Sequence, residues 1–205
     1  MCFDPLEAVI AAFGGGEVVI LTDDAGRENE GDLIVAGCHA TPEAVNCLIT
    51  HGRGLLCVPM AAAWAARLNL VEPVSKHDLF NTAFTQSVDV IAGNTTGISA
   101  FDRARTIKAL SDPASTLEDF YSPGHVFPLI ARPGGVLERD GHTEGVVELA
   151  TLAGLPPVGV LCEILNPDGS MARLPDLELL KQRLGLKMTS IADLIACRRR
   201  HSESA

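Results

Sequence analysis

The chain has 205 residues, 47% of them hydrophobic, which is enough to bury a core within one compact domain spanning residues 1–205. Its 26 acidic and 16 basic residues give a net charge of −10, which disfavours a basic surface for nucleic acid or anionic lipid. The chain shows no basic signal-peptide region and no apolar run long enough to cross a bilayer, so we expect a cytoplasmic protein with no nucleic-acid or membrane partner.

Short apolar or β-branched runs predict strands, and capping residues followed by helix-forming stretches predict helices. In chain order we expect strands at 17–21 and 33–36, a helix at 42–51, a strand at 54–60, a helix at 61–70, a strand at 83–90, a helix at 99–110, a strand at 126–131, a helix at 143–153, a strand at 158–165 and two closing helices that begin at 175 and 190. Thr41 and Ser99 are the expected N-caps, and Gly185 is expected to stop the first closing helix. Because several strands are joined by short connections, we expect an α+β fold, with a mixed sheet flanked by helices in a three-layer sandwich.

The six cysteines form no CxxC pair and lie mostly inside apolar segments. This pattern predicts buried, reduced thiols rather than a metal or redox motif.

Residues 23–32 form an unusually charged loop between two apolar strands, with five carboxylates and Arg27. If Glu28, Glu30 and Asp32 are extended, they share one face, where their repulsion raises their pKa values unless a cation neutralises them. Hard oxygen ligands favour Mg²⁺, with Mn²⁺ as a plausible substitute. The alternative is a solvated acidic turn without a metal.

A second polar segment, Arg-Asp-Gly-His-Thr-Glu at 139–144, is a flexible turn that runs into a helix with Thr143 as its expected N-cap. Free backbone amides and the helix dipole attract phosphate, Gly141 permits close approach, and Arg139 offers a bidentate guanidinium. His142 can then reach a metal or a substrate oxygen. Equally, it can serve only as a hydrogen-bonding residue at the helix start.

Two single residues complete the candidate site. His125 lies between Pro123-Gly124 and Pro128, which predicts a rigid turn at the edge of a strand, and a fixed imidazole can shuttle protons. A packed or exposed turn histidine is the alternative. Glu163 falls in an otherwise apolar strand, where a carboxylate is costly enough to indicate a function or a paired charge.

Together these segments resemble the 3,4-dihydroxy-2-butanone 4-phosphate synthase family in order and spacing. The matching motifs are Asp-Asp…Arg-Glu-Asn-Glu-Gly-Asp at 23–32, His-Gly-x-Gly at 51–54, Thr-Thr-Gly-Ile-Ser-Ala-x-Asp-Arg at 95–103, Pro-Gly-His-Val-Phe-Pro-Leu at 123–129, Arg-x-Gly-His-Thr-Glu at 139–144, Leu-Ala-Gly-Leu at 152–155, Cys-Glu-Ile at 162–164 and Asp-Gly-x-Met-Ala-Arg at 168–173. The resemblance implies conversion of D-ribulose 5-phosphate to L-3,4-dihydroxy-2-butanone 4-phosphate and formate in riboflavin biosynthesis. It also implies Mg²⁺ dependence and a homodimer with active sites near the subunit interface.

The resemblance assigns roles residue by residue. Glu28 and His142 match metal ligands, while His125 and Glu163 match residues essential to catalysis. The positions that match substrate contacts are Arg27, Glu28, Asp32, Arg139, Asp140, Gly141, His142, Thr143 and Glu163. The implied reaction is a metal-assisted enolisation followed by dehydration, skeletal rearrangement and loss of formate.

Two departures from the family pattern leave an alternative open. Asp140 places a carboxylate in the expected phosphate turn, and Arg53 stands where a serine is usual. These changes are compatible with a divergent relative that acts on another phosphorylated ketose. A catalytically silent ligand-binding protein is disfavoured because the matched metal and catalytic positions keep their functional residues, and a nucleotide-phosphate enzyme is disfavoured because no GxxxxGK[ST] motif is present. With no room for the fused GTP cyclohydrolase domain of many relatives, we expect a monofunctional protein.

Overall fold

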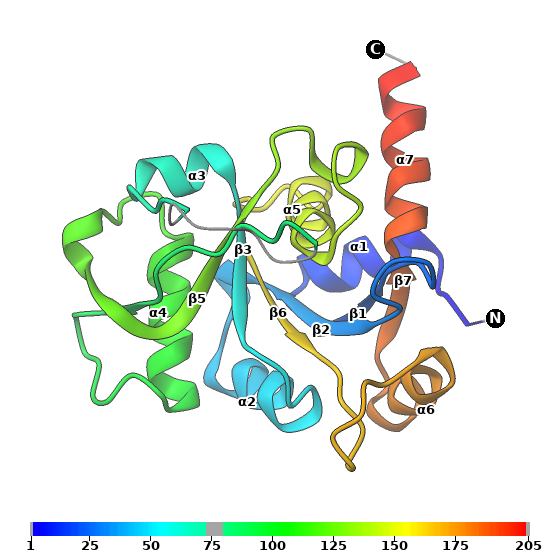
Figure 1. The fold of residues 1–205 in the computed structure, drawn as a ribbon, viewed down its shortest axis with the longest axis horizontal. Helices are drawn as coiled ribbons and strands as arrows, with labels where there is room; N and C mark the ends of the chain where they lie inside the picture. The colour runs from blue at the N-terminus through cyan, green and yellow to red at the C-terminus, as the bar shows by residue number, and fades with distance from the viewer. Residues whose placement is uncertain (1, 73–79, 204–205) are drawn as a thin grey trace.

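The computed structural model describes residues 2–72 and 80–203, and in these ranges the chain forms a seven-stranded sheet with helices on both faces (Figure 1). The strands are β1 (Val19–Thr22), β2 (Gly31–Ala36), β3 (Cys57–Ala61), β4 (Val88–Val90), β5 (Phe120–Ala131), β6 (Gly159–Glu163) and β7 (Lys187–Ser190). The helices are α1 (Leu6–Gly14), α2 (Pro42–His51), α3 (Ala62–Arg67), α4 (Ala100–Ser111), α5 (His142–Leu152), α6 (Leu174–Leu184) and α7 (Ile191–Glu203), with short 3-10 helices η1 (Gly37–His39), η2 (Leu117–Asp119) and η3 (Gly135–Leu137).

The strand order is β4-β5-β3-β6-β2-β1-β7, and the sheet mixes parallel with antiparallel pairs. β1 pairs with β7, and β3 with β5, in parallel, whereas the other neighbours are antiparallel. β1 and β2 form a hairpin in register from Val19↔Ile34 to Thr22↔Gly31, which makes the acidic loop the tip of that hairpin. The expected mixed α+β sheet is confirmed.

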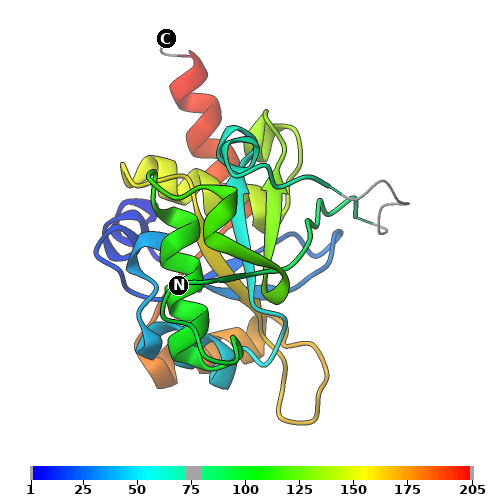
Figure 2. The same ribbon diagram turned by 90° about the vertical axis from the view of Figure 1, so that its left-hand side faces the viewer.

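Each face of the sheet has its own hydrophobic core, because successive side chains of a strand point to opposite faces. Ile20 and Leu33 point into a core covered by α2, α4 and α6. Leu21 and Ile34 point into a core covered by α1, α5 and α7. The three-layer arrangement is therefore confirmed, and α7 projects beyond the rest of the fold in Figures 1 and 2.

Several expected helix boundaries are confirmed by their capping contacts. Thr41 Oγ1 accepts a hydrogen bond from Ala44 N at 3.2 Å, and Ser99 Oγ accepts one from Asp102 N at 3.0 Å. Gly185 ends α6 with φ 65°, a left-handed conformation that favours glycine. None of the helices in the described ranges has the length and apolar character needed to span a membrane.

Some local expectations are wrong. The strand expected at 83–90 is reduced to β4, and β7 was not expected at all. β5 begins at Phe120, so the segment around His125 is strand rather than turn. The N-cap of α5 is Gly141 rather than Thr143, because the helix already begins at His142. The three errors at strands involve pairing with segments distant in the sequence, which local propensity does not register.

We expect Gly159→Ala to destabilise the protein by about 1–3 kcal/mol, because an added Cβ would overlap Val146 Cγ1 in the α5 core and approach Val35 O to 3.2 Å. Urea unfolding measures the loss. Gly14→Ala is the matched control, since its Cβ would make an ordinary 3.4 Å contact with Ala153, and we expect a change below about 1 kcal/mol. Equal effects of the two substitutions would contradict this packing.

Candidate active site

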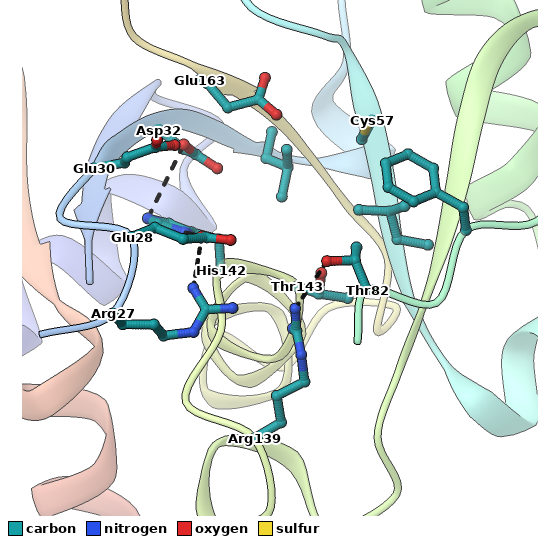
Figure 3. A pocket seen from close by; sticks show the side chains of 13 residues that line it. Arg27, Glu28, Glu30, Asp32, Cys57, Thr82, Arg139, His142, Thr143 and Glu163 are labelled. Atoms are coloured by element: carbon teal, nitrogen blue, oxygen red, sulfur yellow. Dashed lines mark hydrogen bonds and ion pairs between the residues drawn. The ribbon is translucent and has the colours of Figure 1, made fainter. Parts of the chain in front are cut away.

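A polar pocket of about 230 Å³ lies on the face of the sheet that α5 covers (Figure 3). The hairpin loop supplies acidic and basic side chains, the strands supply the floor, and the start of α5 supplies one wall. The lining residues are Arg27, Glu28, Glu30, Asp32, Cys57, Thr82, Phe84, Leu129, Arg139, His142, Thr143, Leu161 and Glu163. Most of the residues singled out in the sequence therefore converge on a single pocket.

The carboxylate of Asp23 stabilises the acidic loop by accepting hydrogen bonds from two of its backbone amides. Its Oδ1 accepts a hydrogen bond from Glu30 N at 2.8 Å, and its Oδ2 accepts one from Glu28 N at 3.0 Å. Arg173 holds the other side of the loop, donating from Nη1 to the carbonyls of Glu28 and Asn29. These bonds turn the side chain of Glu28 towards the pocket, so Asp23 and Arg173 position a candidate ligand.

Glu28 and His142 meet at the centre of the site. Glu28 Oε2 lies 3.6 Å from His142 Nδ1, and ligand atoms of Asp23, Glu28 and His142 all lie within 4.8 Å of one another. His142 Nε2 and Asp32 Oδ1 face each other at 4.0 Å, and both are buried without a hydrogen-bond partner among the described residues. Such unpaired buried atoms require a ligand or water. The donors, two carboxylates and an imidazole, fit a hard divalent cation.

Electrostatics in this cluster follow from burial and from close opposite charges. Burial raises the pKa of Asp32 to about 7, against the opposing charge of His142. Burial alone would lower the pKa of His142, but Asp32 and the nearby Glu28 raise it to about 9. Although burial opposes it, the contacts of Glu28 with His142 and Arg27 lower the pKa of that carboxyl. Cationic side chains therefore outweigh burial at Glu28, whereas burial prevails at Glu30 and Asp32, whose pKa values are raised.

Arg27 provides much of that positive charge. Its Nη1 lies 2.6 Å from Glu28 Oε2 and 3.1 Å from Asp23 Oδ2, and the guanidinium stacks over the ring of Phe80 at 5.3 Å. The same Glu28 oxygen faces His142. Arg27 is thus bonded to the carboxylates that would receive a metal, and a bound cation would compete with it for Glu28.

Asp32 and Glu163 stand side by side because β2 and β6 are antiparallel with Asp32↔Glu163 directly in register. Glu163 Oε2 also accepts a hydrogen bond from Leu55 N at 2.7 Å, which fixes the carboxylate at the end of its strand. The sequence indicates that Glu163 in this apolar strand has a function or a paired charge, and in the structure its side chain lines the pocket together with Asp32. Two carboxylates at one edge of the cavity are suited to proton transfer.

The opposite end of the pocket is formed by Arg139 and the start of α5. Arg139 donates to Glu144 Oε2 at 2.6 Å, to Phe80 O at 3.1 Å and to Thr82 Oγ1 at 3.1 Å. Its guanidinium is therefore already hydrogen-bonded to protein acceptors, and does not offer all its N–H groups to a phosphate. Within the described residues, no side chain caps the first turn of α5, so its amides are suited to an anion.

Two expected substrate contacts lie outside the pocket lining. The Asp140 side chain is 62% exposed and does not line the cavity, although its Oδ1 lies 3.7 Å from Nε of the lining residue Arg27. Gly141 is not a lining residue either, and a Cβ there would overlap Arg139 Nη1. Glycine is thus needed for the Arg139–Glu144 pair to pass close to the backbone. Arg53 donates to Leu165 O at 2.7 Å and lines a separate pocket.

His125 is the expected catalytic residue that does not line the pocket. It lies on β5, on the same face as Leu129 but four residues earlier, which places it roughly 13 Å further along the strand. Its ring is 44% exposed and its Nδ1 lies 2.6 Å from Asp89 Oδ2. His125 therefore lies outside the lining of the pocket that its own chain forms.

The sequence reading missed the apolar wall of the pocket and the side chains that hold its polar groups in place. Cys57, Phe84, Leu129 and Leu161 form the wall, and nothing distinguishes them in the sequence from ordinary core residues. Asp89 had a detectable signal, a carboxylate between two valines, of the same kind that singled out Glu163. All six cysteines are free, as expected, but only Cys57, Cys162 and Cys197 are buried, and the other three are partly exposed.

Comparisons with known proteins show which family and fold the chain resembles. Residues 7–197 match the family described as 3,4-dihydroxy-2-butanone 4-phosphate synthase. The riboflavin biosynthesis protein RibBA of Bacillus mycoides (strain KBAB4) is 53% identical over 201 residues, which cover 97% of this chain and 50% of the relative. RibBA of Bacillus cytotoxicus is 51% identical over 200 residues, with the same coverage of 97% and 50%. This chain therefore spans about half the length of the curated relatives it matches.

Solved structures show the same fold. RibBX, a two-domain 3,4-dihydroxy-2-butanone 4-phosphate synthase from A. baumannii, is similar with a TM-score of 0.91 and 46% identity, covering 95% of this chain and 58% of the other. A 3,4-dihydroxy-2-butanone 4-phosphate synthase in complex with two magnesium ions has a TM-score of 0.92 and 41% identity, covering 97% and 98%. The second similarity extends over nearly the whole of both chains.

Proposed function

Because the chain belongs to the 3,4-dihydroxy-2-butanone 4-phosphate synthase family, we propose that it converts D-ribulose 5-phosphate to L-3,4-dihydroxy-2-butanone 4-phosphate and formate. The observation that carries this proposal is the pocket in which Glu28 and His142 lie beside the neighbouring carboxylates Asp32 and Glu163. Residues 1–205 are proposed to act as a single domain of this kind.

Glu28 and His142 are the proposed ligands of a Mg²⁺ ion, which supplies Lewis-acid polarisation of the substrate's ketone oxygen. Their fit rests on the hard donor atoms and on the unpaired His142 Nε2 and Asp32 Oδ1. Asp23 keeps Glu28 turned towards this position through the Glu28 backbone amide. A magnesium-bound structure of a relative 41% identical to this chain supports the choice of cation.

The chain's own side chains then bind the substrate and move protons. The ketone end of ribulose 5-phosphate lies between Asp32 and Glu163. Their carboxylates accept and return the protons of enolisation and dehydration. The phosphate end lies at the first turn of α5, where free amides and the side chain of Thr143 meet the fixed charge of Arg139. Anchoring both ends keeps the carbon skeleton in register during its rearrangement.

We further propose that two copies of the chain form a homodimer in which His125 of one copy completes the pocket of the other. His125 is exposed and lies outside its own pocket, and the chain also exposes large apolar side chains on the neighbouring elements. Ile98 is 54% exposed, Phe101 61% and Tyr121 62%, on or next to α4 and β5. A cluster of this kind next to a catalytic residue is suited to covering by a second copy.

The alternative, a divergent enzyme for another phosphorylated ketose, depends on Asp140 and Arg53, and neither side chain lines the pocket. We therefore expect the usual substrate. Purified protein with Mg²⁺ would be offered ribulose 5-phosphate, xylulose 5-phosphate, fructose 6-phosphate and tagatose 6-phosphate, with formate and the four-carbon phosphate followed by NMR. Formate from ribulose 5-phosphate alone supports the proposal, whereas faster turnover of another ketose phosphate would replace it with the divergent reading.

Metal binding is expected to be pH-dependent, because carboxylates raise the pKa of His142 to about 9 against the effect of burial. At pH 7 the metal-free ring is protonated, and a metal needs it neutral, so binding must release this proton. The apparent affinity for Mn²⁺ should rise about tenfold per pH unit from pH 7 to 9 and then level off. Calorimetric titration in buffers of different ionisation enthalpy measures the released proton. His39→Gln, outside the site, should leave this release unchanged, and a flat pH profile would contradict the assignment.

A further inference from the structure

Asp89 and His125 are joined by two contacts across the β4–β5 pair. Asp89 Oδ1 accepts a hydrogen bond from His125 N at 2.9 Å, and Asp89 Oδ2 lies 2.6 Å from His125 Nδ1. The Asp89 residue is only 8% exposed, between two buried valines. A buried carboxylate in an apolar strand is costly unless it is paired, and here its partners are the backbone and the ring of one residue.

These contacts fix the protonation pattern of the ring. An ionised carboxylate only accepts hydrogen bonds, so Nδ1 must carry the proton that lies between it and Asp89. When the imidazole is neutral, Nε2, the nitrogen that does not face Asp89, is then left with a lone pair, in a side chain that is 44% exposed. A histidine held this way is set to take a proton through Nε2.

The ring is also enclosed by a loop that is itself anchored. Gly97 has φ 91°, and a Cβ at this position would overlap both Asp89 Oδ2 and His125 Nδ1. Asp102, at the start of α4, holds this loop by accepting hydrogen bonds from Thr95 Oγ1 at 2.6 Å and from Gly97 N at 3.3 Å. The loop therefore lies directly against the Asp89–His125 contact and limits rotation of the ring.

We propose that Asp89 is a positioning residue that holds His125 in the Nδ1-protonated tautomer and so presents Nε2 to the substrate. This inference rests on the proposed catalytic role of His125. Asp89 itself acts through the ring and does not touch the substrate. Thr95, Gly97 and Asp102 support the same geometry from the side of α4.

The test is long-range proton–nitrogen correlation NMR of ¹⁵N-labelled protein, with the His125 signals assigned by their loss in His125→Gln. The wild-type neutral ring should show the Nδ1-protonated tautomer, and Asp89→Asn should shift it towards the Nε2-protonated form, since an amide can donate to Nδ1. Asp89→Asn should also lower kcat by about 10²- to 10⁴-fold with little change in KM, and Asp89→Glu should restore part of the loss. Ser87→Ala, which removes only the bond from Gly124 N to the Ser87 hydroxyl, is the matched control and should change neither readout.

An Nε2-protonated ring in the wild type, or an unchanged tautomer in Asp89→Asn, would overturn the inference whatever the activity. If Asp89→Asn fails to fold, the tautomer seen in the wild-type spectrum alone can still overturn the inference. A wild-type enzyme that shows the Nδ1 tautomer but releases no formate would instead count against the proposed function. The two failures are therefore distinguishable.

Discussion

Glu28→Gln is expected to lower kcat/KM for ribulose 5-phosphate by roughly 10³-fold, because Lewis-acid stabilisation of the developing charge is worth several kcal/mol. Glutamine keeps the shape of the side chain but removes the charge that faces His142 Nδ1 at 3.6 Å. Binding of Mn²⁺, measured by calorimetry or by electron paramagnetic resonance, should weaken in parallel. The effect on stability should be small, because the loop is held through backbone groups by Asp23 and Arg173.

Asp24→Asn is the matched control for this substitution. Asp24 is an exposed carboxylate of the same loop, and among the described residues its side chain accepts a hydrogen bond only from Gly26 N, at 2.7 Å. It changes the net charge by the same amount and should leave both Mn²⁺ affinity and turnover close to wild type. If Glu28→Gln retained full metal affinity, or if Asp24→Asn lost as much, the assignment of Glu28 as a ligand would be wrong.

Mixing two inactive variants is expected to restore activity. His125→Ala and Glu163→Gln should each be nearly inactive as homodimers. In a mixed dimer, one pocket combines Glu163 of the first subunit with His125 of the second, and both are intact. Random exchange makes about half of the dimers mixed, with one functional site in two, so activity should reach about a quarter of the wild-type value.

Co-expression with two different affinity tags allows the mixed species to be isolated, and native mass spectrometry verifies its composition. Purified mixed dimer should then show about half of the wild-type activity per dimer. A pure mixed dimer without activity would mean that His125 serves the pocket of its own chain. That result would contradict the shared site while leaving the roles of Glu28 and His142 unaffected.

Local sequence patterns predicted the elements whose determinants are local. Thr41, Ser99 and Gly185 mark helix ends through contacts within a few residues, and all three behave as expected. β7 has only four residues, and it is a strand because it lies beside β1, more than 160 residues away in the sequence. The segment at 83–90 alternates like a strand, yet only Val88–Val90 forms one, and Phe84 makes just an isolated bridge to Leu129 of β5.

The residues of the candidate site likewise fall into those recognisable from the local sequence and those whose placement depends on distant segments. The acidic loop at 23–32 and the turn at 139–144 were recognisable from unusual residue density, and the structure brings both to one pocket. That Asp32 faces Glu163 follows from the β2–β6 register, which the sequence does not state. The exposed position of Asp140, the enclosure of Arg139 by protein acceptors and the pairing of His125 with Asp89 depend likewise on contacts between distant segments.

The most direct test of the central claim is an NMR assay of the purified protein with ¹³C-labelled D-ribulose 5-phosphate, run with Mg²⁺, with EDTA, and with EDTA followed by excess Mg²⁺. We expect formate and L-3,4-dihydroxy-2-butanone 4-phosphate in equal amounts with Mg²⁺, neither product with EDTA, and recovery when Mg²⁺ is restored. Unchanged turnover in EDTA would contradict the role given to Glu28 and His142. Folded protein that binds Mg²⁺ but releases no formate would contradict the proposed reaction itself.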